Sequence, residues 1–158
     1  MITLRAAATP ELVDVARELI REYAKMPHVI GRWMDPGAEI DTLPGDYAPP
    51  HGTILLAIDD ANPVGCGCIR PFDEPGSCEM KRLYVKPSAR GRGVGEILVR
   101  ALVHEGVAMR YITMKLDTAP DLAAARALYT RLGFREIPRY GSNVPDISIC
   151  YELDLTTS

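Results

Sequence analysis

The sequence predicts a mixed α/β fold in which helices pack on the faces of a central sheet. Short segments in which apolar and polar residues alternate recur along the chain, as expected of half-buried strands. Three longer segments between them carry apolar residues at helical spacing. Hydrophobic residues make up 47% and charged residues 25% of the chain, a globular balance that excludes a disordered or collagen-like protein.

The N-terminal third is predicted to hold a strand, a helix and a long irregular segment. Residues 2–7 alternate, and Thr9-Pro10-Glu11 then provides a hydroxyl cap, a proline in the first turn and an acid at the positive end of a helix. Apolar spacing extends that helix to about residue 25. Five prolines and four glycines between Pro27 and Gly52 indicate an irregular segment with one short helix near 37–43, and such long segments are usually functional.

The rest of the chain alternates between predicted strands and helices. A turn composition at Asp60-Ala61-Asn62-Pro63 joins two strands into a hairpin. Gly133 has the position of a helix C-cap. The expected strands are 53–59, 64–71, 78–86, 111–117, 134–140 and 147–155. One expected helix begins at residue 94, and another covers 121–132.

Size and charge exclude several classes of protein. With 158 residues the chain is expected to form a single domain over 1–158. Its net charge is −3, from 18 basic and 21 acidic residues, so a surface devoted to nucleic acid is not expected. The longest aliphatic run, 54–58, is too short to span a membrane. No signal-peptide pattern is present, so the predicted location is the cytoplasm.

Cysteines and histidines do not form a metal motif. The spacing of Cys66-Gly67-Cys68 differs from that of a zinc knuckle, and no second ligand pair follows at a matching interval. Residues two apart in a strand share a face, so both thiols are expected to be buried and reduced. The three histidines are scattered, and we therefore expect no metal.

A glycine-rich loop, Arg90-Gly91-Arg92-Gly93-Val94-Gly95, lies between a predicted strand and a predicted helix. Free backbone amides at such a junction favour an anion. The P-loop and dinucleotide patterns both fail because Glu96 follows Gly95. Residues 80–100 carry six basic residues and one acid, a local charge of +5, which suits a polyphosphate. A solvated surface turn and an RNA contact remain alternatives for the loop alone.

Three segments resemble the GNAT (Gcn5-related) N-acetyltransferase superfamily. Arg90-x-x-Gly93-x-Gly95 is similar to its acyl-CoA loop, and residues 79–85 (EMKRLYV) are similar to its fourth strand. Residues 125–134 (ARALYTRLGF) resemble its late helix and the start of the strand after it. The resemblance covers nearly the whole chain. It implies a mixed, mostly antiparallel sheet of about seven strands with helices on both faces.

The resemblance also implies an acetyl-CoA-dependent N-acetyltransferase that transfers the acetyl group to a primary amine of a small molecule or peptide in a ternary complex. Acetyl-CoA would be held by the glycine loop and by the edge of a fourth strand that splays from the fifth. The cofactor-binding residues would be Leu83, Tyr84, Val85, Arg90, Gly91, Arg92, Gly93, Val94 and Gly95. Many members carry an asparagine seven residues before the helix tyrosine, where this chain has Leu122.

Two catalytic residues follow from the resemblance. Tyr129 corresponds to a tyrosine often placed beside the sulfur, and Glu79 to a glutamate that acts as general base in histone-acetylating relatives. Proton transfer from a tyrosine to a thiolate is uphill by about 1.5 pKa units, or roughly 2 kcal/mol, so a hydrogen bond or a late transfer is plausible. Tyr129 could instead be a core residue on the apolar face of its helix. Glu79 could instead pair with Lys81 or with Arg70 across the hairpin.

The acceptor site is expected in the variable segments, at Arg32, Trp33, Arg139 and Tyr140. An arginine there could hold a carboxylate of an amino acid or acidic metabolite, and Trp33 could stack on the acceptor. The alternative functions are a non-catalytic acyl-CoA-binding sensor or regulatory module, and an RNA binder. The acidic total and the low aromatic content argue against the RNA binder. The resemblance further suggests a homodimer.

Overall fold

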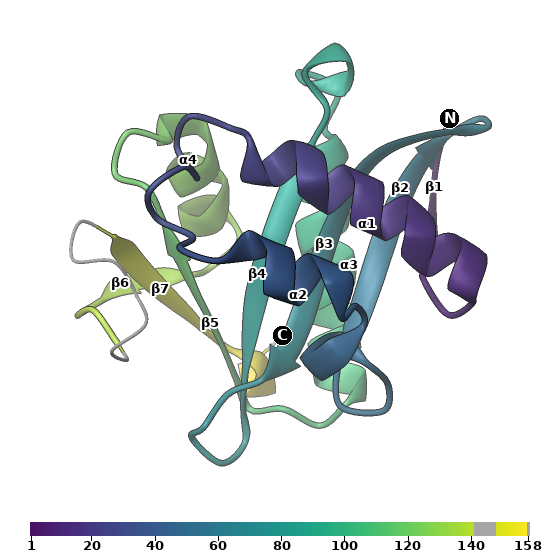
Figure 1. The fold of residues 1–158 in the computed structure, drawn as a ribbon. Coiled ribbons are helices and arrows are strands. Elements are labelled where there is room, and N and C mark those ends of the chain that lie inside the picture. The colour runs from purple at the N-terminus through teal and green to yellow at the C-terminus, as the bar shows by residue number, and fades with distance from the viewer. Residues whose placement is uncertain (141–147, 158) are drawn as a thin grey trace.

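The computed structural model describes residues 1–140 and 148–157 and contains one seven-stranded sheet with the order β1-β2-β3-β4-β5-β7-β6. All neighbouring strands are antiparallel except β4 and β5, which are parallel. The strands are β1 (Ile2–Ala6), β2 (Thr53–Asp59), β3 (Asn62–Pro71), β4 (Ser77–Val85), β5 (Thr113–Thr118), β6 (Arg135–Ile137) and β7 (Ile149–Asp154). The predicted fold class, a mostly antiparallel sheet with helices on its faces, is confirmed (Figure 1).

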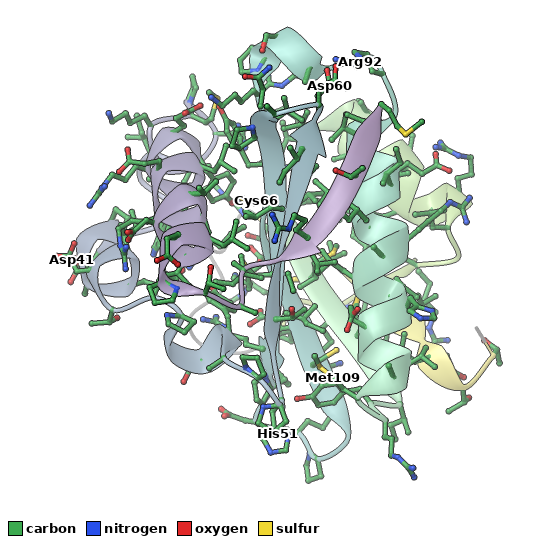
Figure 2. The ribbon with its side chains drawn as sticks, turned by 90° about the vertical axis from the view of Figure 1, so that its right-hand side faces the viewer. Asp41, His51, Asp60, Cys66, Arg92 and Met109 are labelled. Atoms are coloured by element: carbon green, nitrogen blue, oxygen red, sulfur yellow. The ribbon has the colours of Figure 1, made fainter. Side chains whose placement is uncertain are left out.

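Four α-helices accompany the sheet within the described residues: α1 (Pro10–Ala24), α2 (Pro36–Asp41), α3 (Val94–Ala108) and α4 (Ala123–Arg131). Helices α1 and α3 lie on opposite sides of the sheet (Figure 2). The Thr9 hydroxyl accepts a hydrogen bond from the Leu12 amide, so the predicted N-cap of α1 is confirmed. Short 3-10 turns follow α2 at Gly45–Tyr47 and precede the glycine loop at Pro87–Ala89.

Two buried clusters, one on each face, hold the layers together. One joins Leu98 and Leu102 of α3 to the sheet and to Tyr129, and the other joins Ile20 of α1 to strands β2 and β3. Burying such apolar side chains stabilises the fold by about 2 kcal/mol each. The sheet is therefore the shared wall of two cores.

The Cys66-Gly67-Cys68 segment shows how β3 serves both cores. Both thiols are fully buried on the α1 side, as predicted, and burial raises the pKa of Cys66 to about 12. Gly67 faces α3, where an added Cβ would lie 2.7 Å from Leu102 Cδ1. Glycine between the cysteines thus lets α3 approach the sheet closely.

Strands β4 and β5 pair along only part of their length. The parallel register joins Ser77, Cys78 and Glu79 to Thr113, Met114 and Lys115, and no further pairs follow. Beyond Glu79 the strands diverge, as Figure 1 shows. The splay implied by the family resemblance is present, and it leaves one edge of β4 unpaired from Met80 to Val85.

The predicted elements differ from the structure mainly at their ends. β3 begins at Asn62 because the Asn62 backbone pairs with Asp59, which draws half of the predicted turn into the ladder. α2 covers 36–41 rather than 37–43. β6 is only three residues long, because its pairing with β7 ends at Ile137. Residue 147, the predicted start of the last strand, lies outside the described residues.

Candidate active site

A cleft of about 750 Å³ lies where β4 and β5 diverge. Its floor includes residues of both strands, among them Met80, Leu83, Leu116 and Thr118. Its walls come from α1, the segment before α2, α4 and the end of the β6 region. This volume accommodates a small molecule together with the reactive end of a thioester.

The cleft brings together six of the residues predicted from the sequence. The lining includes both predicted catalytic residues, three of the four predicted acceptor residues and one cofactor residue: Tyr129, Glu79, Arg32, Trp33, Tyr140 and Leu83. Arg139 is exposed and is not part of this lining, so its role in acceptor binding stays a prediction. Leu122, in place of the family's asparagine, also lines the cleft.

Arg82 interrupts β4 at the floor of the cleft. It has φ +60°, rare for a residue other than glycine, and the register between β3 and β4 shifts at this point. Glu39 of α2 accepts two hydrogen bonds from the guanidinium, at 2.8 and 2.9 Å, and the Trp33 ring lies 3.6 Å beneath it. A carboxylate from α2 and an aromatic ring from the segment before it therefore hold the bulge in place.

The Glu39 carboxylate is charged in this setting. Burial acts to raise its pKa, but the hydrogen bonds and charge of Arg82 outweigh burial and hold the pKa below its ordinary value. The Tyr47 hydroxyl adds a third hydrogen bond to Glu39, at 3.0 Å. The pair consequently ties α2 to the bulge of β4.

Arg82 and Glu39 belong to a continuous row of alternating charges, which we name the ion-pair chain. Successive members lie 2.8–3.8 Å apart and all of them line the cleft. The ion-pair chain runs Arg32–Asp117–Lys81–Glu79–Arg70–Glu39–Arg82. It crosses from the segment before α2 over β5, β4 and β3 and returns through α2 to β4.

Tyr129 projects from α4 into the cleft. It is only 5% exposed, and its ring packs against Phe134 and Tyr151 with centroids 5.7 and 5.8 Å away. Tyr129 therefore fits both roles considered for it, because its ring packs in the core and the residue also lines the cleft. Burial, with smaller effects from Tyr23 and Asp117, raises the pKa of Tyr129 well above its ordinary value. The hydroxyl remains neutral near pH 7 and can donate a hydrogen bond.

Glu79 and Tyr140, predicted separately as a base and an acceptor residue, contact each other. The Tyr140 hydroxyl donates to Glu79 Oε2 at 2.8 Å. Glu79 Oε1 accepts from Arg70 at 3.1 and 3.2 Å, and Lys81 Nζ lies 3.8 Å from Oε2. Both pairings considered for Glu79 as a structural residue thus exist. Glu79 and Tyr140 both line the cleft, so the pair faces it together.

The glycine loop joins the end of β4 to α3. Gly91 and Gly93 adopt left-handed backbone angles, with φ +79° and +78°, and a Cβ at either would meet open space. Gly93 is the N-cap of α3 and has no side-chain cap, so the first amides of α3 stay available to a ligand. Arg90 donates to the Val85 carbonyl at 3.1 Å, which fixes the loop to β4.

Fewer basic side chains near the glycine loop are available to a ligand than the local charge of +5 suggests. Five of the six basic residues in 80–100 form ion pairs, and Arg90 alone has no carboxylate partner within the described part of the chain. Arg92, for example, pairs with Asp59 at 2.8 Å, at the tip of the β2–β3 hairpin, where Figure 2 shows it near Asp60. The amides and Arg90 remain as the anion-binding groups of the loop.

Three members of the ion-pair chain were not predicted from the sequence as parts of the site: Asp117, Glu39 and Arg82. Asp117 stands at a polar position of the β5 alternation, like Lys115, so the pattern alone did not mark it. Lys81 was considered only as a partner of Glu79, and Arg82 only as local basic charge. Glu39 stood in a segment with no periodic pattern, and only its three-dimensional contacts reveal its role.

The described residues show neither a membrane-spanning helix nor a cluster of metal-ligating side chains. Within residues 1–140 and 148–157, no helix combines the length and apolar character needed to cross a bilayer. The same residues contain no group of three or more histidine, cysteine or acidic side chains arranged for a metal ion.

Comparison with known proteins agrees with the site. The model of the acetyltransferase (GNAT) family matches residues 14–134, which include the diverging strands, the glycine loop and Tyr129. The chain belongs to the GNAT acetyltransferase family.

Individual GNAT proteins resemble the chain over nearly its whole length. An uncharacterized N-acetyltransferase of Schizosaccharomyces pombe is 34% identical over 148 residues, 92% of this chain and 91% of that protein. A GNAT-family acetyltransferase structure from Staphylococcus aureus aligns with a TM-score of 0.81 at 22% identity, covering 98% of this chain and 99% of its own. A Thermoplasma acidophilum N-acetyltransferase, solved with coenzyme A, has a TM-score of 0.76 at 16% identity, with 98% and 99% covered. The GNAT fold and an acetyl-CoA-dependent acyltransferase activity are thereby supported.

We predict that Glu39→Gln destabilises the protein by about 2 kcal/mol. The substitution leaves the positive charge of Arg82, whose side chain is 10% exposed, without its partner. Because the Glu39 side chain is 22% exposed, the loss of stability is smaller than for a fully buried pair. The measurement is urea unfolding of wild type and variant between pH 3 and 7. Because the folded-state pKa of Glu39 is lowered, the difference is full above its ordinary value of 4.5 and is lost as pH falls through the lowered value.

Glu18→Gln is the matched control for this measurement. Glu18 pairs with Arg21 on the outer face of α1 and is 68% exposed, so its loss should change the free energy of unfolding by less than about 0.5 kcal/mol. Equal effects of the two substitutions would contradict the structural role of Glu39.

Proposed function

We propose that the protein transfers the acetyl group of acetyl-CoA to a primary amine of a small molecule or peptide by direct attack in a ternary complex. The observation that carries this proposal is the meeting of two features at one cleft. An unpaired strand edge and a glycine loop suit the donor, and an enclosed polar pocket beside them suits the acceptor. A sensor that only binds acyl-CoA needs no such pocket.

The donor is proposed to bind largely through backbone groups. The unpaired edge from Leu83 to Val85 offers backbone groups such as the Val85 amide to the pantetheine amides, as an added strand would use them. The pyrophosphate would rest on the amides from Gly91 to Gly95, at the positive end of α3, with Arg90 beside it. The Tyr84 side chain is buried and donates to Glu22 at 3.1 Å, and its backbone lies opposite Cys66 of β3, so its contact with the donor stays a prediction from the resemblance.

Tyr129 is proposed to assist the leaving thiolate. When the amine attacks the thioester carbon and the carbon–sulfur bond breaks, negative charge develops on sulfur. The Tyr129 hydroxyl makes no side-chain hydrogen bond among the described residues, and is free to donate one to that sulfur. Its raised pKa makes full proton transfer more uphill than the ordinary difference of about 1.5 units. A hydrogen bond is therefore favoured over proton transfer.

Glu79 is proposed to collect the amine proton through Tyr140. As the Tyr140 oxygen accepts a proton from the attacking nitrogen, its own proton passes along the 2.8 Å hydrogen bond to Glu79 Oε2. Tyr140 stays neutral throughout, in keeping with a pKa that burial and the neighbouring Glu79 raise. An acceptor whose amine is already neutral would bypass this relay.

Calorimetric titration with acetyl-CoA, with NADH and ATP as controls, tests donor binding. We expect selective binding of acetyl-CoA in the micromolar range, on the order of −8 kcal/mol. Gly93→Ala should weaken it about tenfold, because a left-handed alanine costs about 1–2 kcal/mol and distorts the loop without any clash. Gly37→Ala, a helical glycine with φ outside the left-handed range, should leave affinity unchanged. Binding of NADH or ATP instead would refute the donor assignment.

Tyr129→Phe should lower kcat by about 10- to 100-fold while leaving acetyl-CoA affinity within about twofold. The reason is that the variant removes the donor to sulfur and keeps the packed ring. Thiol release in an acceptor screen provides the rate, and calorimetry provides the affinity. An unchanged rate would remove Tyr129 from the chemistry and leave it as a core residue.

Glu79→Gln and Tyr140→Phe should each lower kcat/KM at pH 7 by about 100-fold. For both variants the deficit should shrink as pH rises, because the acceptor amine then loses its proton to solvent. The measurement is the pH–rate profile of the two variants and wild type. A deficit that stays constant with pH would show that the pair only supports the fold.

A cytoplasmic location, a homodimer and a single domain over 1–158 stay predictions from the sequence.

A further inference from the structure

The ion-pair chain has an uneven number of charges. Its seven members comprise four cations and three anions, which leaves a net charge of +1 on the ion-pair chain itself. Arginines stand at both ends. At one end Arg82 is satisfied by Glu39 and by the Trp33 ring. The unbalanced positive charge therefore lies at the other end of the ion-pair chain, at Arg32.

Arg32 is incompletely paired. Its Nη2 donates to Asp117 at 3.1 Å and to Ser148 at 2.8 Å. Its Nη1 is buried and has no hydrogen-bond partner, the one such side-chain atom found in the described part of the chain. A buried donor without a partner is costly, and more so when the group is charged.

Asp117 cannot neutralise Arg32 by itself. The same carboxylate accepts from Lys81 at 3.0 Å, and the Ser148 hydroxyl donates to it at 3.3 Å. Lys81 and Arg32 thus share one anion, since the next acid, Glu79, is already bound by Arg70 and Tyr140. The cluster around Asp117 needs one further negative charge to be balanced.

We infer that the acceptor carries a carboxylate, which binds at Arg32 and completes the ion-pair chain. This inference rests on the proposed acetyl transfer. A carboxylate brings one negative charge and oxygen acceptors that suit a guanidinium. A phosphomonoester, with nearly two charges, would exceed the surplus. Arg32 lines the cleft with 16% of its side chain exposed, so a modest turn of the guanidinium presents Nη1 to the ligand.

The acidic rim of the cleft suits the approach of such an acceptor. Asp35, Asp46 and Asp73 line the cleft and are exposed. Because they are exposed, water and salt screen their charges more than those of the ion-pair chain. They favour entry of an acceptor that still carries an ammonium group, whose amine then reacts at Tyr140, while Arg32 favours its carboxylate. The acceptor class that matches both is an amino acid or a related amino carboxylate.

The test compares acceptors that differ only in a carboxylate. Glycine against glycinamide, L-leucine against L-leucinamide and L-aspartate against L-asparagine are assayed by thiol release from acetyl-CoA. The readout is KM, because the amines of each pair differ in acidity and kcat would report that difference. In parallel, saturation-transfer NMR measures binding of the same compounds to the protein with and without CoA. We expect at least tenfold tighter binding of the acid in at least one pair.

Arg32→Gln should abolish that preference, and Arg32→Lys, which keeps the charge but loses Nη1, should restore only part of it. Arg5→Gln, which removes an exposed positive charge from the outer strand β1, should retain it. Calorimetry with acetyl-CoA and a thermal melt verify that each variant is folded and binds the donor.

Equal binding of acids and amides by wild type would overturn the carboxylate inference. Acetylation of amines in that case would leave the proposed function intact. Absence of acetyl-CoA binding would instead refute the proposed function, and the NMR comparison would still decide the question of the carboxylate.

Discussion

The pairing of Arg82 with Glu39 is the constraint on which the site depends. Arg82 has a left-handed conformation in β4, and α2 provides the carboxylate that makes this conformation tolerable. The bulge lies in the β3–β4 ladder, three residues beyond Glu79, the last residue of β4 that pairs with β5. Trp33 packs on the Arg82 guanidinium, so the Arg82–Glu39 pair joins this part of β4 to the wall of the cleft. A short helix in a segment rich in proline and glycine thus shapes the floor of the cleft.

Much of the fold could be predicted from the sequence because its signals are local. Thr9 as a cap, the alternation of β1 and the apolar face of α3 depend on neighbouring residues, and each prediction was confirmed. The ends of elements were less predictable. β3 extends into its turn and β6 stops early because pairing partners, rather than the residues themselves, set those limits.

The donor side of the site could be predicted better than the acceptor side for a related reason. Gly91 and Gly93 lie within one short loop, and their left-handed backbone angles are a local requirement that glycine meets. The acceptor side is assembled from pairs far apart in sequence, such as Arg32 with Asp117 and Glu39 with Arg82. The local charge of +5 around the glycine loop overstated the positive charge available to a ligand, because most of these basic residues are paired with acids elsewhere in the chain.

The buried cysteines have a chemical consequence for a protein of this family. Each turnover of an acetyl-CoA-dependent transferase releases a free thiol close to an activated thioester. Thiol–thioester exchange and mixed-disulfide formation both require a thiolate that the other reactant can reach. All four cysteines are buried, and burial raises the pKa of each thiol, to about 12 for Cys66 and Cys78. The protein is consequently shielded from acylating or glutathionylating itself, and its thiols compete with neither the acceptor nor the product.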